Sequence, residues 1–359
     1  MNAMTQLRDL LKALRPQIPD SLFDGRGRDQ LLLRVGDFPA AVAANLCIFE
    51  MRLDDPEPAA DFSVTVTSSR VPHHYLAGSD GAAATSLKAR LDAYLASKPE
   101  PYRWLMLEYD LIDIPEERKA APAINLRSDA SLTPSGATFE PARLADTLSR
   151  VFGRSDAGHE HRALSRAFAE LPPGAVVAFA AAFPERTPRS VRLVVAEVSA
   201  AQVGAFLDRL GWPGSIATVR NFLLGLHDVS NRFMIAFDVT PEGVLPRLGF
   251  EIYPTAVGDR DFRGLLSAWH TTRSYHWLSL INRLVEMGLC LQSKADGLLS
   301  WPKQCNLYGT NGTYGLRMGI NHIKIVMDAE HVQAKAYAGL QCFPTRKYPN
   351  PPSQNSTHK

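Results

Sequence analysis

Residues 320–341, INHIKIVMDAEHVQAKAYAGLQ, contain two runs of alternating apolar and polar side chains, separated by the short polar segment 328–331. The apolar positions share one face of each extended run and are Ile323, Ile325, Met327, Ala334, Ala336, Ala338 and Leu340. Because successive side chains of a strand point to opposite faces, this alternation predicts a half-buried antiparallel hairpin.

The polar face of this hairpin carries an unusual set of side chains. It holds His322, Lys324, Lys335 and Tyr337 beside Gly339. One interpretation is that these residues line a pocket. The other is an ordinary sheet surface, open to water or to a partner.

Composition restricts the classes of protein to be considered. The chain has 359 residues, 45% hydrophobic and 21% charged, with a net charge of +2, which is typical of a globular protein. Lys and Arg form no run, so a nucleic-acid partner is not expected. The four cysteines are far apart and form no CxxC pair, which argues against a zinc ribbon or disulfide framework and favours a reducing cytoplasm. The longest apolar run, 175–183, is too short to cross a bilayer, and no signal peptide is indicated.

Elements of secondary structure follow one another in a regular order. Strands are predicted at 31–35, 45–53, 62–68, 104–111, 123–128, 175–183, 190–198, 231–239 and 246–253, before the hairpin. Helices are predicted near the N-terminus and at 84–97, 140–152, 158–170, 199–210, 215–227, 260–271, 275–290 and 294–300. From residue 140 onward, groups of two or more helices alternate with pairs of strands, and this cycle occurs three times.

The late strands each have one apolar face and one mixed face. In 231–239 and 246–253 the mixed faces include Arg232, Asp238, Arg247 and Glu251. Parallel sheets bury both faces and read as continuous apolar runs, so a doubly wound fold is not expected. We therefore predict an α+β fold: a closed antiparallel β-barrel surrounded by paired α-helices in repeated ααββ units, with polar residues inside.

We expect a monomer in which 1–60 joins the same domain as the barrel, 61–343 is the catalytic barrel, and 344–359 is a disordered tail. This arrangement resembles the ABBA prenyltransferases, the PT-barrel family of indole, phenol and peptide prenyltransferases. The most specific fragment is Lys335–Ala336–Tyr337, which is similar to the Lys-x-Tyr pairs that this family places against a diphosphate. Arg192 and Arg247 occupy comparable positions, but Val194 and Gly249 follow them where a tyrosine would complete the pair. As in that family, no DDxxD motif is present.

The resemblance implies a prenyl diphosphate donor and an aromatic or peptide acceptor, and it leaves a need for Mg²⁺ open. The residues expected to bind diphosphate are Lys324, Lys335, Tyr337, Arg192, Arg247 and Tyr253. Those expected near the acceptor are Trp104, Met106, Glu251, His322, Gly249 and Gly339. Glu108 is the first candidate for the proton acceptor and Glu251 the second.

The two hairpin lysines suggest a sharper expectation. Lys324 lies four residues before the turn and Lys335 four after it, so the two face each other. Facing ammonium groups repel, and we expect a phosphate or diphosphate between them, with Tyr337 capping it. Removing Lys335 is then expected to leave the free protein as stable or slightly more stable.

Other functions stay open. The barrel interior also suits a non-catalytic protein that binds a peptide or lipid, and a hydrolase or transferase on an unrelated α+β fold remains an alternative. His159 and His161 point apart on a helix and are not expected to bind metal. Trp269, Trp277 and Trp301 are expected to pack in the core, and the glycine-rich segment 309–315 is expected to be a loop.

Overall fold

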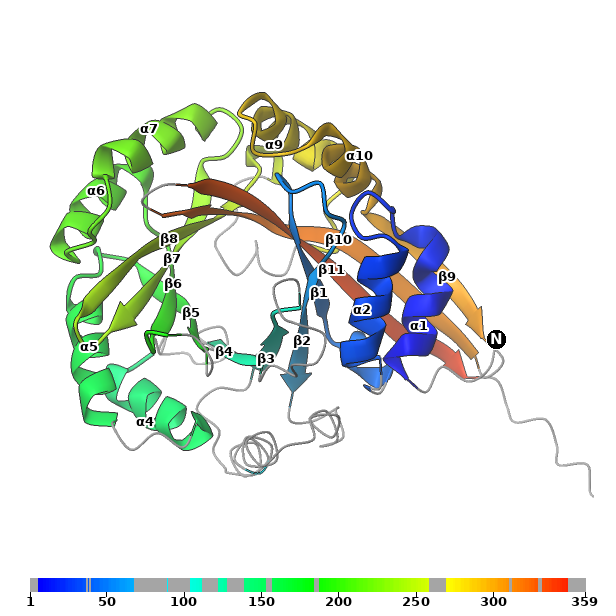
Figure 1. Ribbon diagram of the computed structural model, residues 1–359, viewed down its shortest axis with the longest axis horizontal. Coiled ribbons are helices and arrows are strands. Elements are labelled where there is room, and N and C mark those ends of the chain that lie inside the picture. The colour runs from blue at the N-terminus through cyan, green and yellow to red at the C-terminus, as the bar shows by residue number, and fades with distance from the viewer. Residues whose placement is uncertain are drawn as a thin grey trace, which may run out of the picture.

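The strands of this protein form one sheet that closes into a ring. In the computed structural model they are β1 (Cys47–Arg52), β2 (Asp61–Thr67), β3 (Trp104–Tyr109), β4 (Ala123–Arg127), β5 (Val176–Ala182), β6 (Val191–Ala196), β7 (Arg232–Thr240), β8 (Gly243–Tyr253), β9 (Lys303–Gly309), β10 (Gly312–Met327) and β11 (Val332–Lys347). Their order is β11-β1-β2-β3-β4-β5-β6-β7-β8-β10-β9, and β11 also pairs with β10 (Figure 1). The pairing of β10 with both β8 and β11 closes the barrel, and β9 continues the sheet beyond it.

The structure describes residues 6–36, 38, 40–67, 89, 104–111, 122–127, 139–152, 157–183, 187–257, 269–309, 312–328 and 331–347. Helices within these ranges are α1 (Leu7–Leu14), α2 (Gly25–Val35), α4 (Pro141–Phe152), α5 (Ala157–Ala169), α6 (Ala200–Arg209), α7 (Ile216–Leu226), α9 (Ser274–Glu286) and α10 (Gln292–Ser300), with short 3-10 turns η1 (Arg15–Gln17), η2 (Ala40–Ala44) and η3 (Thr255–Val257). None of these helices combines the length and the apolarity needed to cross a membrane.

The helices lie outside the barrel, in pairs. Helix α4 packs on α5, α6 on α7 and α9 on α10, as the predicted ααββ order requires (Figure 1). Their apolar stripes meet the outward faces of the strands. Phe206 of α6 lies 5.8 Å from Phe237 of β7, measured between ring centroids, and Phe49 of β1 lies 5.7 Å from Trp301. The main hydrophobic core is therefore a layer between barrel and helices.

The inward faces of the strands differ from the outward ones. On the hairpin, Ile323, Ile325 and the alanines of β11 belong to the outer core, while Lys324 and Lys335 point the other way. A smaller apolar cluster of buried residues lies on the inner faces of β5 to β8, and its members are Ala178, Val194, Ala196, Met234, Ala236 and Tyr253. The prediction of alternating faces in this hairpin is confirmed.

Several local predictions are wrong. Residues 31–35 are not a strand but the last residues of α2, a helix that is capped at its start by Asp24, which accepts a hydrogen bond from Gly27 N at 3.0 Å. Leu31 and Val35, one helical turn apart, are both buried. The glycine-rich segment expected to be a loop supplies the first residues of β10 from Gly312 onward, and its partner β9 was not predicted.

The ends of other predicted elements also differ. Strand β11 continues to Lys347, so the tail predicted to start at 344 cannot begin before 348, and 348–359 lie outside the described residues. The predicted helix 84–97, except Ala89, and residues 260–268 of the helix predicted at 260–271 lie outside them too. Trp269, Trp277 and Trp301 are all buried, as predicted.

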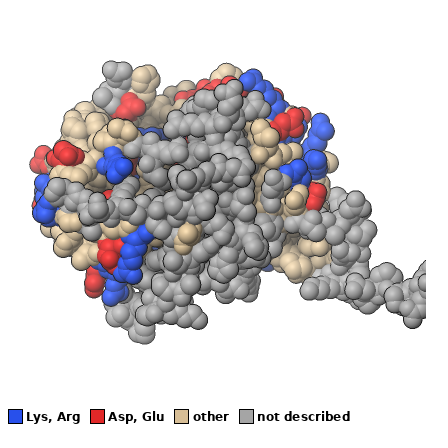
Figure 2. Space-filling view, turned by 60° about the horizontal axis from the view of Figure 1, so that its bottom comes forward, with Lys and Arg blue, Asp and Glu red and all other residues tan. Residues whose placement is uncertain are grey.

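Charged side chains of both signs are mixed on the face of the molecule that Figure 2 shows. On the face shown in Figure 2, basic and acidic side chains alternate around the visible rim, and neither sign forms a continuous field there. Among the described residues, a compact group of charged side chains lies inside the barrel.

Candidate active site

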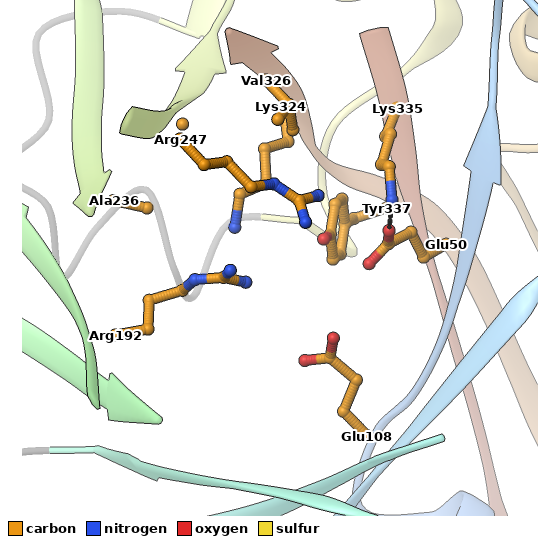
Figure 3. A pocket seen from close by; sticks show the side chains of 10 residues that line it. Glu50, Glu108, Arg192, Ala236, Arg247, Lys324, Val326, Lys335 and Tyr337 are labelled. Carbon is orange, nitrogen blue, oxygen red and sulfur yellow. Dashed lines mark hydrogen bonds and ion pairs between the residues drawn. The ribbon is translucent and has the colours of Figure 1, made fainter. Parts of the chain in front are cut away.

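A small polar pocket, with a cavity volume of about 20 Å³, lies inside the barrel. It is lined by Glu50, Glu108, Arg192, Ala236, Arg247, Gly249, Lys324, Val326, Lys335 and Tyr337. Figure 3 shows the heads of Arg192, Arg247 and Lys324 turned toward the same space, with Glu108 across from them. Strands far apart in the sequence supply these residues, and only barrel closure brings them together.

Lys335 is held by a carboxylate from the first strand. Its Nζ donates to Glu50 Oε1 at 2.5 Å, and both side chains are buried. The hydroxyl of Tyr337 is also hydrogen-bonded to Glu50, which lies directly opposite Tyr337 in the register of β1 and β11. Burial alone would raise the pKa of Glu50, but Lys335 and these hydrogen bonds hold that pKa well below its usual value. Glu50 is therefore a carboxylate anion at neutral pH.

Lys324 has a different carboxylate partner. Its Nζ donates to Glu251 Oε1 at 3.3 Å, and the two residues face each other in the register of β10 and β8. Burial lowers the pKa of Lys324, whereas for Glu251 the lowering by His322 and Lys324 exceeds the rise due to burial. Lys324 and Lys335 do face each other across the hairpin, as predicted. Within the fold, however, Glu251 and Glu50 offset their charges.

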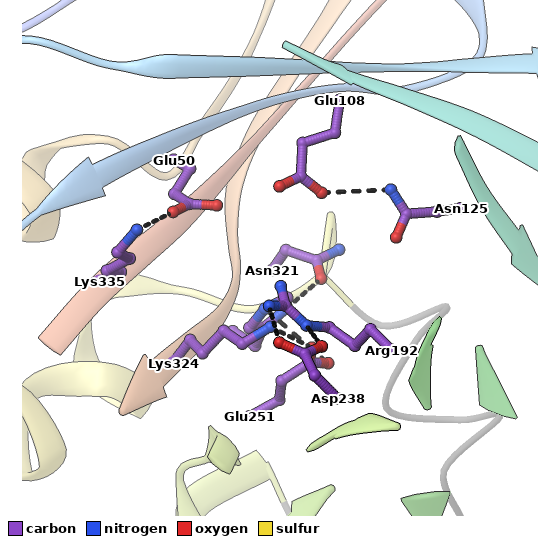
Figure 4. A network of polar contacts seen from close by, with 10 residues as sticks. Glu50, Glu108, Asn125, Arg192, Asp238, Glu251, Asn321, Lys324 and Lys335 are labelled. Carbon is purple, nitrogen blue, oxygen red and sulfur yellow. Dashed lines mark hydrogen bonds and ion pairs between the residues drawn. The ribbon is translucent and has the colours of Figure 1, made fainter. Parts of the chain in front are cut away.

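Arg192 forms a two-pronged ion pair with Asp238. Its Nε and a terminal nitrogen donate to the two carboxylate oxygens of Asp238 at 2.8 and 2.9 Å, from the neighbouring strand (Figure 4). The guanidinium also lies 4.6 Å from the ring centre of Phe183. A two-pronged pair of this kind fixes the plane of the guanidinium and aims its remaining N–H groups.

Glu108 of β3 lies across the pocket from these cations. Its Oε2 accepts a hydrogen bond from Asn125 Nδ2 at 3.2 Å. Burial, together with repulsion from Glu50 and Asp110, raises the pKa of Glu108, although Arg192 and Lys324 act in the opposite direction. A carboxyl group with a raised pKa, facing empty space, is suited to accept and release a proton.

His322 lies beside the pocket, stacked on Tyr337 with ring centroids 4.2 Å apart. Its Nδ1 is 2.8 Å from Asn321 Oδ1, so Nδ1 carries the proton and Nε2 carries the lone pair. Burial lowers the pKa of His322 to about 4, which leaves the ring neutral at pH 7. Among the described residues, His322 Nε2 and Tyr253 Oη are buried without a hydrogen-bond partner. His322 Nε2 lies 3.9 Å from Glu251 Oε2, and the residues that line the pocket include neither His322 nor Tyr253.

The structure brings most of the predicted diphosphate residues together. Lys324, Lys335, Tyr337, Arg192 and Arg247 all line the pocket, whereas Tyr253 belongs to the apolar cluster next to it.

The residues predicted near the acceptor are more dispersed. Gly249 lines the pocket, where a Cβ would come within 2.9 Å of Lys324 Cε, so its lack of a side chain makes room for the lysine stem. Gly339 is covered by the ring of Trp269, which a Cβ would approach to 2.8 Å. Met106 is half-buried on β3 and outside the pocket lining, and the side chain of Trp104 lies outside what the structure describes.

Three polar residues of the site were not predicted: Glu50, Asn125 and Asp238. The alternation in β1 does place Glu50 opposite Phe49 and Met51, on the inward face. What the sequence lacks is the strand register that brings Glu50 to Lys335. Among the described residues, no three His, Cys, Asp or Glu side chains converge as a metal site.

Comparisons with known proteins support the fold. No family model matches the chain, and no curated protein matches it. In structure the chain is similar to a 6-dimethylallyltryptophan synthase from Micromonospora olivasterospora in complex with DMASPP and Trp, with a TM-score of 0.50, 15% identity, and coverage of 92% of this chain and 96% of that chain. A ternary complex of the prenyltransferase PriB with L-tryptophan and dimethylallyl thiolodiphosphate has a TM-score of 0.49 at 14% identity, covering 95% and 98%. The first likeness confirms the predicted helix-flanked antiparallel barrel.

Proposed function

We propose that this protein is an aromatic prenyltransferase of the PT-barrel family. It moves an allylic prenyl group, dimethylallyl or geranyl, from its diphosphate to an aromatic small molecule or a peptide side chain. The observation that carries the proposal is the convergence of four cations and Tyr337 on one pocket inside the barrel, across from Glu108.

The cationic wall suits the leaving group. When the allylic C–O bond breaks, its electron pair leaves with the diphosphate, which then carries several negative charges. A fixed cation at about 4 Å is worth roughly 4 kcal/mol at an effective dielectric near 20. Arg192, Arg247, Lys324 and Lys335 supply the cations, three of which are paired with carboxylates in the free protein, and Tyr337 adds a hydroxyl donor.

The neighbouring apolar cluster suits the prenyl cation. Ala236 lines the pocket and also belongs to the cluster with Val194 and Met234, so the two compartments adjoin. An allylic cation is quenched by water, and a closed barrel with an apolar lining excludes water from it. The tyrosine ring face adds a cation–π contribution of about 0.5–2 kcal/mol.

Glu108 is the candidate for the group that accepts the proton released in the reaction. The acceptor's π electrons form the new C–C bond to the prenyl cation, and the resulting arenium ion loses a proton from the same carbon. We assign that proton to the carboxylate of Glu108, which faces the pocket from the wall opposite the cations. Glu251 is committed to Lys324 and is the weaker candidate.

The unpartnered atoms beside the pocket favour an acceptor with a polar N–H or O–H group. His322 Nε2 is a lone pair in a buried position, and an indole N–H or a phenol O–H is a matching donor. The solved relative holds Trp, so an indole is the first acceptor to test here. We propose further that the protein works as a monomer in the cytoplasm, in keeping with its free cysteines.

The experiment combines binding and turnover. Inorganic diphosphate, dimethylallyl diphosphate and geranyl diphosphate are each expected to raise the melting temperature. Incubation with tryptophan, a phenol or a short peptide containing aromatic residues, with and without Mg²⁺, is expected to yield a product heavier by one prenyl group. Stabilisation by peptides or lipids but by no diphosphate would indicate the non-catalytic binding protein instead.

A further inference from the structure

Glu50 is bound to both Lys335 and Tyr337, two residues that the proposed function assigns to the prenyl diphosphate. Its carboxylate accepts from Lys335 Nζ at 2.5 Å and is hydrogen-bonded to the Tyr337 hydroxyl. These are the charged and polar ends of the Lys335–Ala336–Tyr337 fragment on β11. A carboxylate oxygen and a diphosphate oxygen are the same kind of acceptor for such donors.

The pairing of β1 with β11 positions Glu50 for this contact. Strand β1 pairs with β11 along six residues, with Glu50 opposite Tyr337 and Arg52 opposite Lys335. Lys335 therefore reaches along the strand to Glu50, two positions away from its direct neighbour. Both side chains of the pair are about nine-tenths buried, since 11% of Lys335 and 7% of Glu50 are exposed.

The other two ion pairs of the site differ from this one. Arg192 keeps terminal N–H groups beyond its two bonds to Asp238, and Lys324 uses one of three protons on Glu251. Glu50 alone joins the lysine and the tyrosine of one Lys-x-Tyr fragment. Lys335 Nζ also keeps two further protons, but the Tyr337 hydroxyl has only one, so an anion that takes the Tyr337 donor must first displace Glu50.

We propose that Glu50 is a displaceable internal anion, so that donor binding exchanges its carboxylate for a diphosphate oxygen on Lys335 and Tyr337. This inference rests on the proposed function, because it assigns those two residues to the diphosphate. Glu50 then determines specificity. A diphosphate displaces it because Arg192, Arg247 and Lys324 bind its other oxygens, whereas a monophosphate offers fewer contacts in return.

Calorimetric titration with inorganic diphosphate and with inorganic phosphate tests the exchange. Glu50→Gln removes the competing negative charge. This variant is expected to bind diphosphate roughly tenfold more tightly, because Lys335 no longer has to give up a charge-assisted hydrogen bond to Glu50. Glu50→Asp keeps the charge but shortens the side chain, and it too is expected to bind more tightly. Phosphate affinity is expected to gain more than diphosphate affinity, so the preference for diphosphate shrinks.

A double-mutant cycle with Lys335→Ala separates exchange from simple charge repulsion. In the Lys335→Ala background there is no lysine to compete for, so the tenfold gain from Glu50→Gln is expected to fall to about twofold or less. Glu251→Gln is the matched control, since it removes another carboxylate of the site but not the partner of Lys335. Its effect is expected to be the same in both backgrounds.

The possible outcomes are distinct. If wild type binds diphosphate and both Glu50 variants bind it equally, or if the gain persists without Lys335, the exchange is overturned and the proposed function stands. If neither wild type nor any variant binds diphosphate, the proposed function fails and the exchange with it. Binding by the Glu50 variants alone would support the exchange. Should Glu50→Gln fail to fold, as measured by circular dichroism, the affinity of Glu50→Asp decides between these outcomes.

Discussion

Two adjoining parts of the barrel interior are lined by different kinds of side chain, charged in one part and apolar in the other. Around the pocket, three buried ion pairs join neighbouring strands: Arg192–Asp238, Lys324–Glu251 and Lys335–Glu50. Beside them, the apolar cluster consists of alanines, Val194, Met234 and Tyr253. The same strands carry both. Arg192 and Val194 occupy successive inward positions on β6. Ala236 and Asp238 do the same on β7.

The contrast shows how finely a barrel can divide its interior. Inward positions follow every second residue, about 7 Å apart along a strand, so one step takes the lining from charged to apolar. For a reaction that separates a multiply charged leaving group from a reactive carbocation, this is a useful distance. Under the proposed function, the ion pairs would lie beside the leaving group and the apolar cluster beside the carbocation.

The largest effect is expected for a substitution of Glu108, which lies across the pocket from the cations. Glu108→Gln keeps the size of the side chain but removes its ability to accept a proton. We expect prenyl transfer to slow by about 100-fold or more, with diphosphate affinity retained. Turnover measured by product mass checks this, and exposed Glu242→Gln in the β7–β8 turn is the control. Unchanged turnover would remove Glu108 from the mechanism.

Lys335→Ala breaks one ion pair in the charged part of the barrel interior and leaves the apolar part unchanged. We expect diphosphate affinity to fall roughly 30-fold, since one cation is lost and Glu50 stays behind. The free protein is expected to lose about 3 kcal/mol of stability, because a buried carboxylate is left without its partner. This reverses the expectation drawn from two facing lysines alone. Calorimetry and urea unfolding measure the two effects, and Lys12→Ala, exposed on α1, is the control. Equal stability would show that Glu50 finds another partner.

His322 predicts how stability depends on pH. Its folded pKa, about 4, lies below the value of 6.5 for an unperturbed histidine. Between these values the unfolded chain binds more protons, so stability falls as the pH is lowered. His322 contributes a loss of about 1 kcal/mol between pH 6.5 and 5.5. Urea unfolding of His322→Gln is expected to lack that loss, while exposed His331→Gln retains it. Identical slopes in wild type and His322→Gln would mean that the ring is protonated in the fold.

The smallest effect is expected where the two parts meet. Gly249→Ala places a Cβ 2.9 Å from Lys324 Cε and 3.3 Å from the Cβ of Ala236. The lysine stem must move aside, and we expect diphosphate affinity to fall about threefold with little change in stability, because a flexible chain yields cheaply. Gly225→Ala on α7, whose added Cβ meets nothing closer than 4.0 Å, is the control. A loss as large as that of Lys335→Ala would mean that Lys324 cannot adjust.

Much of this architecture is readable in the sequence because it depends on local pattern. Alternation in the hairpin predicts both its faces and the pairing of Lys324 with Lys335, and the helix periodicity predicts the paired outer helices. The strand predicted at 31–35 is wrong because a short run of leucine and arginine suits either element, and the cap at Asp24 decides for the helix.

The rest of the site depends on register between distant strands. Glu50 and Lys335 are 285 residues apart, and nothing near either one indicates the other. The same holds for Asn125, whose role becomes visible only when β4 lies beside β3 and brings its amide to Glu108. A charged residue in an inward position needs a partner, but only the closed ring shows which one.

The closure of the ring through β1 and β11 has a consequence for how the protein is made. A ribosome delivers β1 long before β11, and the contacts between the two strands are among the most non-local of the described residues. Such topologies fold slowly, and until the last strand emerges the edges of β1 and β10 stay open to wrong partners. Glu50 has no Lys335 to pair with until β11 has been synthesised, so the closure of the barrel is also the step that assembles the pocket.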